Sequence, residues 1–353
     1  MNPTTGSADR AGATVETADN DVESSASKET TMRAIVYRSY GSVDVLHVEE
    51  IARPVISENE VLVRVHAAGL DRGTWHFMTG LPYLGRLAFG LRAPKNPVLG
   101  LDVAGTVAEV GSKVTRFQPG DEVFGVARGS FAEYAAARED KLAPKPARLG
   151  FEQAAVVPVS ASTALQGLRD SGRVEAGQKV LIIGASGGVG TYAVQLAKAF
   201  GAEVTGVCST AKVDLVRSIG ADHVIDYTRE DFADGTRRYD LIVDIGGNRR
   251  LSLLRRALLP KGTLVLLGGE EGGKLTGGMN RQIRALALSL FVGQRLRMFI
   301  VKQNRADLET LSQFIEAGQL TPFIDKSYPL AEVPEAMRRL EAGQVRGKIA
   351  ITI

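Results

Sequence analysis

The residues with the clearest chemical potential form a glycine turn between an apolar strand and a helix. The strand Val180 to Ile183 precedes the turn, and the helical run Tyr192 to Phe200 follows it. Glycines let a ligand approach the backbone closely, and the amides at the start of a helix favour phosphate. The spacing is G-x-x-G-x-x-G rather than G-x-G-x-x-G, so a plain turn is the alternative, but strand, turn and helix occur in the required order. The stretch therefore predicts a dinucleotide site, assigned to Gly184, Ser186, Gly187, Gly188, Val189 and Gly190.

The end of the next strand distinguishes between the two nicotinamide cofactors. An acidic residue about twenty positions beyond the glycines would bind a free ribose 2′-hydroxyl. The chain instead reads Cys208-Ser-Thr-Ala-Lys212, so Ser209, Thr210 and Lys212 offer two hydroxyls and an ammonium where a 2′-phosphate would lie. The pattern favours NADPH over NADH, although Lys212 can also be a solvated lysine early in a helix.

Composition limits the class of protein. A chain of 353 residues suits two domains. Its 43 basic and 40 acidic residues are too balanced to favour nucleic acid as a partner. Cys208, the one cysteine, excludes an internal disulfide and any zinc site built from several cysteines, and it fits a reducing compartment such as the cytoplasm. The longest nearly apolar stretch, Ile283 to Val301, contains three arginines, so we expect no membrane partner.

The order of the patterns predicts an α/β protein with two domains. Residues 1–31 contain almost no large apolar side chains and are expected to be a disordered tail. Residues 32–155 contain short β-rich segments separated by Gly, Pro and Asp, which indicates a β-barrel-like domain. Residues 156–321 alternate strands and helices, which predicts a doubly wound parallel sheet. Residues 322–353 end in a strand that we expect to rejoin the first domain.

Four further motifs accompany the glycine turn: Asn96-Pro-Val-Leu-Gly-Leu-Asp-Val-Ala-Gly-Thr-Val-Ala-Glu-Val-Gly111, Gly120-Asp-Glu-Val-Phe-Gly125, Ser130-Phe-Ala-Glu-Tyr134 and Ser162-Thr-Ala-Leu165. Together with the turn, they resemble a known family, the zinc-free, NADPH-dependent quinone oxidoreductase-like branch of the medium-chain dehydrogenase/reductase superfamily. The resemblance covers Met32 to Ile353 and implies a GroES-like barrel, a Rossmann domain, a cleft between them for the nicotinamide, and a homodimer that pairs through the Rossmann domains.

The same resemblance implies roles for further residues. Lys212 and Tyr227 match the Lys and Tyr that the family uses at the 2′-phosphate and adenosine end. Thr163 matches a threonine expected to touch the nicotinamide, although it can also serve only the helix. The loops Asp244 to Gly246 and Leu267 to Gly269, which include Leu267 and Gly268, match segments beside the far half of the cofactor. Gly347 and Lys348 match a terminal Gly-Lys pair that closes over it.

Two departures from related sequences concern the substrate end of the cleft. Where zinc-dependent relatives place metal-binding Cys and His residues, this chain has Ala67-Ala-Gly-Leu-Asp71 and Gly100-Leu-Asp102, and leucine cannot ligate a metal. Where quinone reductase-like chains show Asn-Pro, an acid and a Tyr, this chain has Asp71, Arg72, Thr74 and His76. His76 is the candidate proton donor, with a surface or lining histidine as the alternative. Asp71 is expected to orient it or only to cap a turn.

The expected activity is transfer of hydride from NADPH to a quinone or an α,β-unsaturated carbonyl, with a proton from His76 or water. Two alternatives remain open: an NADPH-binding redox sensor or interaction protein with little turnover, and a reductase or dehydrogenase of simple aldehydes, ketones and alcohols. An apolar wall or an ordinary packed lid is expected from Trp75, Phe77, Tyr83, Leu84, Leu87 and Phe89.

Overall fold

A computed structural model describes residues 30–247, 249–269 and 273–353. Most of the expected tail, residues 1–29, lies outside this part of the chain, and strand β1 already begins at Thr31. The strands are β1 Thr31–Val36, β2 His47–Ala52, β3 Glu60–Leu70, β4 Asp102–Val110, β5 Glu122–Val126, β6 Tyr134–Arg138, β7 Leu142–Pro144, β8 Lys179–Ile183, β9 Glu203–Cys208, β10 His223–Asp226, β11 Tyr239–Asp244, β12 Leu258–Leu266, β13 Arg295–Met298, β14 Ile324–Pro329 and β15 Lys348–Thr352. The helices are α2 Arg72–Thr79, α3 Arg86–Phe89, α4 Phe151–Ala155, α5 Pro158–Gln166, α6 Gly188–Ala199, α7 Val213–Ser218, α8 Leu251–Ala257, α9 Met279–Ser289, α10 Arg305–Glu316 and α11 Val333–Glu341.

One layer of the molecule is a six-stranded parallel sheet in the order β10-β9-β8-β11-β12-β13. From Val180 to Ile183, β8 is apolar and buried, as expected for a strand whose sheet is covered on both faces. Val180 and Ile182 pack in a cluster with α5 and α6, whereas Leu181 and Ile183 pack in a cluster with α8 and α9. This is the doubly wound Rossmann arrangement, and it places the carboxyl ends of β8 and β9 at one edge of the sheet.

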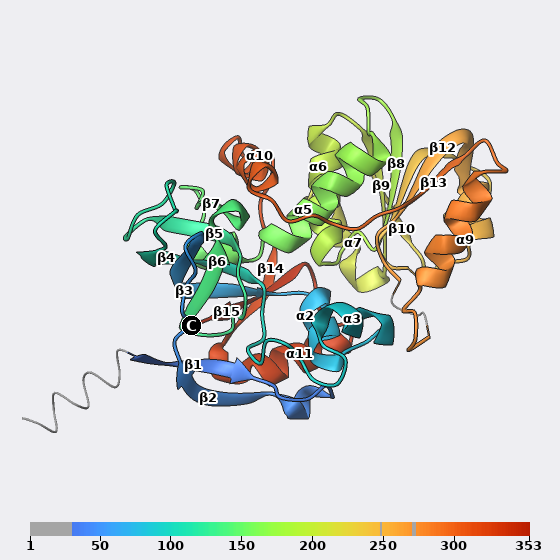
Figure 1. Ribbon diagram of the computed structural model, residues 1–353. Coiled ribbons are helices and arrows are strands. Elements are labelled where there is room, and N and C mark those ends of the chain that lie inside the picture. Colours follow the sequence, from blue (N-terminus) through green and yellow to red (C-terminus); the bar gives the residue numbers. More distant parts are fainter. Residues whose placement is uncertain (1–29, 248, 270–272) are drawn as a thin grey trace, which may run out of the picture.

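A second, mainly antiparallel sheet forms the GroES-like barrel, in the order β14-β15-β3-β4-β5-β7, with β6 paired to β3. The C-terminal strand β15 lies antiparallel to β3, with Ile351 opposite Ala68. Figure 1 shows β15, drawn in red, among the blue and green barrel strands and apart from the parallel sheet. The chain thus enters the barrel, builds the Rossmann domain, and returns to the barrel for its last strand.

The structure adds elements that the sequence patterns did not indicate. Strand β2 pairs with β1, and β13 forms the outer edge of the parallel sheet. Within residues 322–353, a further strand, β14, precedes the expected last strand. Among the described residues, no helix is both long enough and apolar enough to span a bilayer.

Candidate functional site

The glycine turn has the geometry that the sequence motif requires. Gly184 follows β8 with φ 86°, a conformation that L side chains avoid. A Cβ at Gly190 would lie 2.0 Å from the Gly184 carbonyl oxygen, so close packing of α6 on the end of β8 needs glycine there. Helix α6 begins at Gly188, so its first amides lie at the carboxyl edge of the sheet. The turn fits a pyrophosphate bound at a helix N-terminus.

A pocket of about 500 Å³ adjoins this turn at the ends of β8 and β9. It brings together six of the residues assigned from the sequence, Gly184, Ser186, Ser209, Lys212, Tyr227 and Gly246. Arg249 and Cys208, which the sequence reasoning did not assign, complete the lining with Ile183 and Val207. The Arg249 guanidinium lies over the Tyr227 ring, 5.4 Å from its centroid. In the sequence, Arg249 and Arg250 follow the glycines that come after β11. This pair could have indicated a cation beside the pocket.

Lys212 connects the pocket to the C-terminal segment. Its Nζ donates to the carbonyl oxygens of Gly343 and Val345, at 3.2 and 2.7 Å. Burial lowers the pKa of Lys212 below its usual value, while Asp325 opposes this shift. An ammonium has three donors, so Lys212 can hold these carbonyls and still reach a phosphate in the pocket. The neighbouring hydroxyl of Thr210 instead donates to Asp226, 2.5 Å away, and Thr210 is not part of the lining.

The C-terminal Gly-Lys pair reaches the turn by two different contacts. Gly347 N donates to the Ser186 carbonyl oxygen at 2.8 Å, which ties β15 to the glycine turn. Lys348 is 1% exposed, and its Nζ donates to Ser160 Oγ at 2.9 Å. That Nζ also lies 3.7 Å from Asp102 Oδ2. The Lys348 ammonium is therefore held inside the protein, behind Gly188, rather than in the pocket.

Asp102 links the barrel to helix α5 of the Rossmann domain. Its Oδ1 accepts the Val159 N–H at 2.9 Å, in the first turn of α5. Burial raises the pKa of Asp102 to about 8, the Lys348 ammonium opposes this shift, and the Asp71 carboxylate adds to it. On the same helix, Thr163 Oγ1 donates to the Val159 carbonyl oxygen at 2.7 Å. The expected nicotinamide contact of Thr163 thus depends on a helix that Asp102 anchors.

Asp244 lies at the end of β11 and is fully buried. Its carboxylate forms an ion pair with Arg281 of α9 and accepts the Gly247 N–H at 3.2 Å. Arg281 also donates to the Gly247 carbonyl oxygen at 2.9 Å. The backbone of Asp244 accepts from Leu267 and Gly268, so both loops expected beside the cofactor are tied to one residue. Arg281 is a positioning residue that the sequence reasoning did not assign.

His76 lies on α2, and Asp71 immediately precedes this helix. Asp71 is the N-cap of α2, and its Oδ1 accepts the Thr74 N–H at 2.8 Å. The His76 Nδ1 lies 2.7 Å from the Leu81 carbonyl oxygen, so a backbone carbonyl holds the ring. For Asp71, the structure shows the helix cap, which is one of the two expectations. The catalytic roles of His76 and Asp71 stay predictions. The rings of Phe77 and Phe89 pack edge to face, with centroids 4.5 Å apart, whereas Leu87 is exposed.

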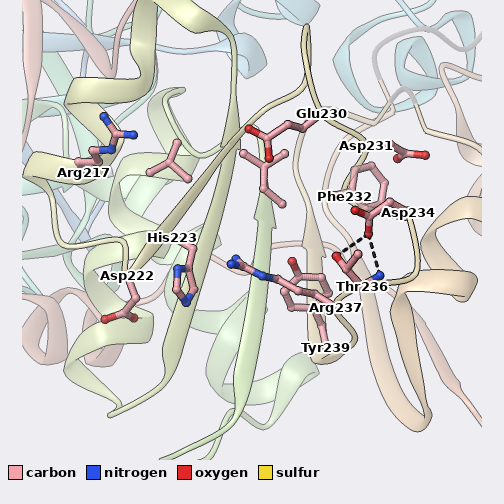
Figure 2. Close-up of a pocket in the computed structure, with 12 residues that line it drawn as sticks. Arg217, Asp222, His223, Glu230, Asp231, Phe232, Asp234, Thr236, Arg237 and Tyr239 are labelled. Atoms are coloured by element: carbon pink, nitrogen blue, oxygen red, sulfur yellow. Dashed lines mark hydrogen bonds between the residues drawn. The ribbon is translucent and has the colours of Figure 1, made fainter.

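A second pocket, of about 370 Å³, lies at the opposite edge of β10 and offers a less suitable site (Figure 2). Several of its charged residues already pair with their neighbours. Asp222 binds Lys198, and Asp234 accepts from the backbone and hydroxyl of Thr236. His223 lies 3.3 Å from Glu203. Within the described ranges, no group of three or more His, Cys, Asp or Glu side chains is placed to hold a metal ion.

Comparisons with known proteins agree with this architecture. Residues 57–147 match the alcohol dehydrogenase GroES-like domain family, and residues 219–351 match a family described as zinc-binding dehydrogenase. The chain is 35% identical to 2-methylene-furan-3-one reductase of Solanum lycopersicum, over 97% of this chain and 84% of the relative. It is also 35% identical to the chloroplastic NADPH-dependent alkenal/one oxidoreductase of Arabidopsis thaliana, over 94% and 82% of the two chains.

Among solved structures, the quinone oxidoreductase from Coxiella burnetii superposes with a TM-score of 0.78 at 28% identity, covering 92% of this chain and 99% of that one. The expected fold, a GroES-like barrel with a Rossmann domain, is confirmed. The chain belongs to the quinone oxidoreductase-like branch of the medium-chain dehydrogenase/reductase superfamily.

Proposed function

We propose that this chain is an NADPH-dependent, metal-independent oxidoreductase that reduces quinones or α,β-unsaturated carbonyls. The observation that carries the proposal is the pocket at the carboxyl ends of β8 and β9, where Ser209 and Lys212 stand in place of a ribose-binding acid. The names of the two curated relatives, an enone reductase and an alkenal/one oxidoreductase, support the substrate class. Leu101, at the position of a metal-binding histidine in zinc-dependent relatives, supports chemistry without a metal.

In this proposal the residues of the pocket hold the two ends of the cofactor. Lys212, Ser209 and Arg249 bind the 2′-phosphate, Tyr227 covers the adenosine, and the amides of Gly188 and Val189 bind the pyrophosphate. When bound, NADPH supplies the hydride. Asp102 fixes α5 and so places Thr163 toward the nicotinamide. His76, held by the Leu81 carbonyl, supplies a proton to the substrate as negative charge builds on its oxygen.

The test is an activity panel with purified protein and NADPH, followed by loss of cofactor absorbance. Oxidation of NADPH by a quinone or an enone, and much less by a simple aldehyde, is the expected result. Reaction with the aldehyde alone would instead assign the chain to carbonyl reduction. Binding of NADPH without oxidation by any acceptor would favour a sensor or interaction protein.

Replacing Lys212 with alanine should weaken binding of NADPH by roughly 1–3 kcal/mol, because a charged hydrogen bond to the 2′-phosphate is lost. Binding of NADH, which lacks that phosphate, should change much less. Titration of protein fluorescence with each cofactor measures both affinities. Lys179, an exposed lysine at the other end of β8, is the matched control. An equal loss for both cofactors would show that Lys212 acts only by holding the Gly343–Val345 carbonyls.

We also propose that the protein is a homodimer and that it works in a reducing compartment such as the cytoplasm. Its proposed domains are residues 32–155 together with 322–353, and residues 156–321. Strand β13 forms the outer edge of the parallel sheet, and Phe291, Met298 and Ile300 are exposed on or beside it. An open strand edge with apolar side chains is suited to pairing with a second copy. Light scattering should give twice the chain mass of 37.7 kDa, and Met298→Asp should shift the protein to the monomer. A wild-type monomer at micromolar concentration would contradict this assembly.

A further inference from the structure

The exposed apolar side chains are concentrated in two segments of the chain. Among the described residues, every exposed large apolar side chain except Val48, Val55 and Tyr227 lies within residues 72–101 or 273–306. Leu87 and Leu91 are 69% and 68% exposed, and Ile283 on α9 is 57% exposed. Phe291, Met298 and Ile300 belong to the strand edge proposed above for the dimer, where a second copy would cover them. The exposed apolar side chains that remain in the two segments include Leu87, Leu91 and Ile283, and a concentration of this kind marks an interaction site.

The same two segments contain no acidic residue. Residues 72–101 hold four arginines or lysines, and residues 273–306 hold seven. Over the whole chain the 43 basic and 40 acidic residues almost balance, so the remaining chain has an excess of acid. The basic residues of the two segments are Arg72, Arg86, Arg92, Lys95, Lys274, Arg281, Arg284, Arg295, Arg297, Lys302 and Arg305.

Backbone hydrogen bonds join the two segments. Tyr83 N donates to the Lys274 carbonyl oxygen at 2.8 Å, and Leu84 N donates to that of Leu275 at 3.2 Å. Figure 1 shows α3 next to the chain that leads into α9. On α9, Arg281 points to the Gly247 carbonyl, whereas Ile283 is exposed. We call the exposed side chains Leu87, Leu91, Ile283, Arg92, Lys95 and Arg284 the apolar-basic face.

We propose that the apolar-basic face docks on the surface of an anionic lipid bilayer. Apolar side chains enter the boundary between headgroups and acyl chains, and flanking arginines and lysines bind anionic headgroups. Both segments are complementary in charge to an anionic surface, because they contain basic residues and no acidic residue that such a surface would repel. Docking of this kind needs no spanning helix, so the expectation of no membrane partner, which considered only spanning segments, does not cover it.

Docking by this face would bring the substrate-side helices to the bilayer, and this consequence rests on the proposed function. Helix α2, which carries His76, leads through residues 80–85 into α3, and α3 lies within the face. A protein seated there would hold its substrate-side helices against the bilayer. Quinones and enones with apolar tails dissolve in that phase and would reach the enzyme without crossing water.

The test is flotation of the full chain, without cofactor, with vesicles of phosphatidylcholine alone or mixed with phosphatidylglycerol. We expect binding to the anionic vesicles only, and weaker binding as salt rises. Arg92→Glu with Lys95→Glu, and separately Leu91→Ser with Ile283→Ser, should each weaken binding by at least about tenfold. The matched controls are Arg237→Glu with Arg238→Glu, on the loop before β11, and Val55→Ser at an exposed apolar site outside both segments.

Three outcomes would overturn the proposal: no binding to anionic vesicles, equal binding to neutral ones, or the same loss in the controls as in the face variants. Gel filtration of each variant identifies the competing occupant. If the face variants dissociate a dimer and leave vesicle binding unchanged, a second copy covers the face. Circular dichroism confirms that each variant is folded. The flotation test uses no cofactor, so its result does not depend on whether the protein reduces quinones or enones. The activity panel uses no vesicles, so its result does not depend on docking.

Discussion

Replacing His76 with alanine is expected to lower the rate of substrate reduction by about 10²-fold or more, within the 10²–10⁴-fold range typical of a positioned acid. The ring sits on α2, and its Nδ1 is held by the Leu81 carbonyl oxygen at 2.7 Å. Since Nδ1 donates to that carbonyl, a proton for the substrate would come from the other ring nitrogen. The variant lacks this donor, so water would have to supply the proton.

The measurement is single-turnover reduction of an enone at saturating NADPH, across a range of pH. His47→Ala, at an exposed position on β2, is the matched control and should leave the rate unchanged. An unchanged rate and pH profile for His76→Ala would remove His76 from proton transfer and leave water as the donor. A loss of NADPH affinity with no loss of rate would show that His76 only supports the local fold.

Above about pH 8, where the buried Asp102 is ionised, replacing it with leucine is expected to lower the free energy of unfolding by roughly 3–5 kcal/mol, as for other broken buried ion pairs. The change leaves the buried Lys348 ammonium without its nearest carboxylate and the Val159 N–H without an acceptor. Urea unfolding followed by circular dichroism measures the loss. The double variant Asp102→Leu with Lys348→Met should recover part of it, because the uncompensated charge is then also gone. A loss below about 1 kcal/mol in the single variant would show that Asp102 carries little of the contact between the domains.

The pH dependence of stability gives a second measurement of the same group. Burial raises the pKa of Asp102 from 3.8 to about 8 in the folded protein. Between these values the unfolded chain has lost the proton that the folded protein keeps, so this group lowers the free energy of unfolding as pH rises from about 4 to about 8. Asp102→Asn keeps an acceptor for Val159 and should flatten this part of the profile. The exposed pair Arg138 and Asp140 provides the control, with little effect expected from Asp140→Asn.

The parts of the fold that the sequence predicted are those with strong local signals. Strand β8 is a run of apolar residues ending in glycine, and β15 follows Gly347, so both could be found. Strand β13, Arg295-Leu-Arg-Met298, was missed because it has only four residues and lies inside the nearly apolar stretch Ile283 to Val301, which was considered only as a possible spanning segment. Helix α2 was not predicted, although Asp71 was expected either to orient His76 or only to cap a turn, and the structure shows its capping hydrogen bond with the Thr74 N–H.

Only those cofactor-site residues that lie in contiguous sequence motifs could be predicted. Gly184, Ser209 and Lys212 follow one another within two strands and one helix, and the structure brings them to one pocket. Lys348 was assigned to the cofactor, but its ammonium lies inside against Ser160, and that pairing spans 188 residues. Arg281 reaches Asp244 in a similar way, from a helix with no motif of its own. Contacts between distant segments leave no pattern in a single sequence.

The position of β15 in the barrel also bears on how the protein is made. Residues Ala67 to Leu70 of β3 have no partner on the side that β15 occupies until residues 348–352 have left the ribosome, whereas every described strand of the parallel sheet is complete by Met298. The Rossmann domain can therefore fold during synthesis before β15 is available to the barrel. Gly347 contacts Ser186 at the start of that same strand, so closing the barrel and finishing the cofactor site are one late event.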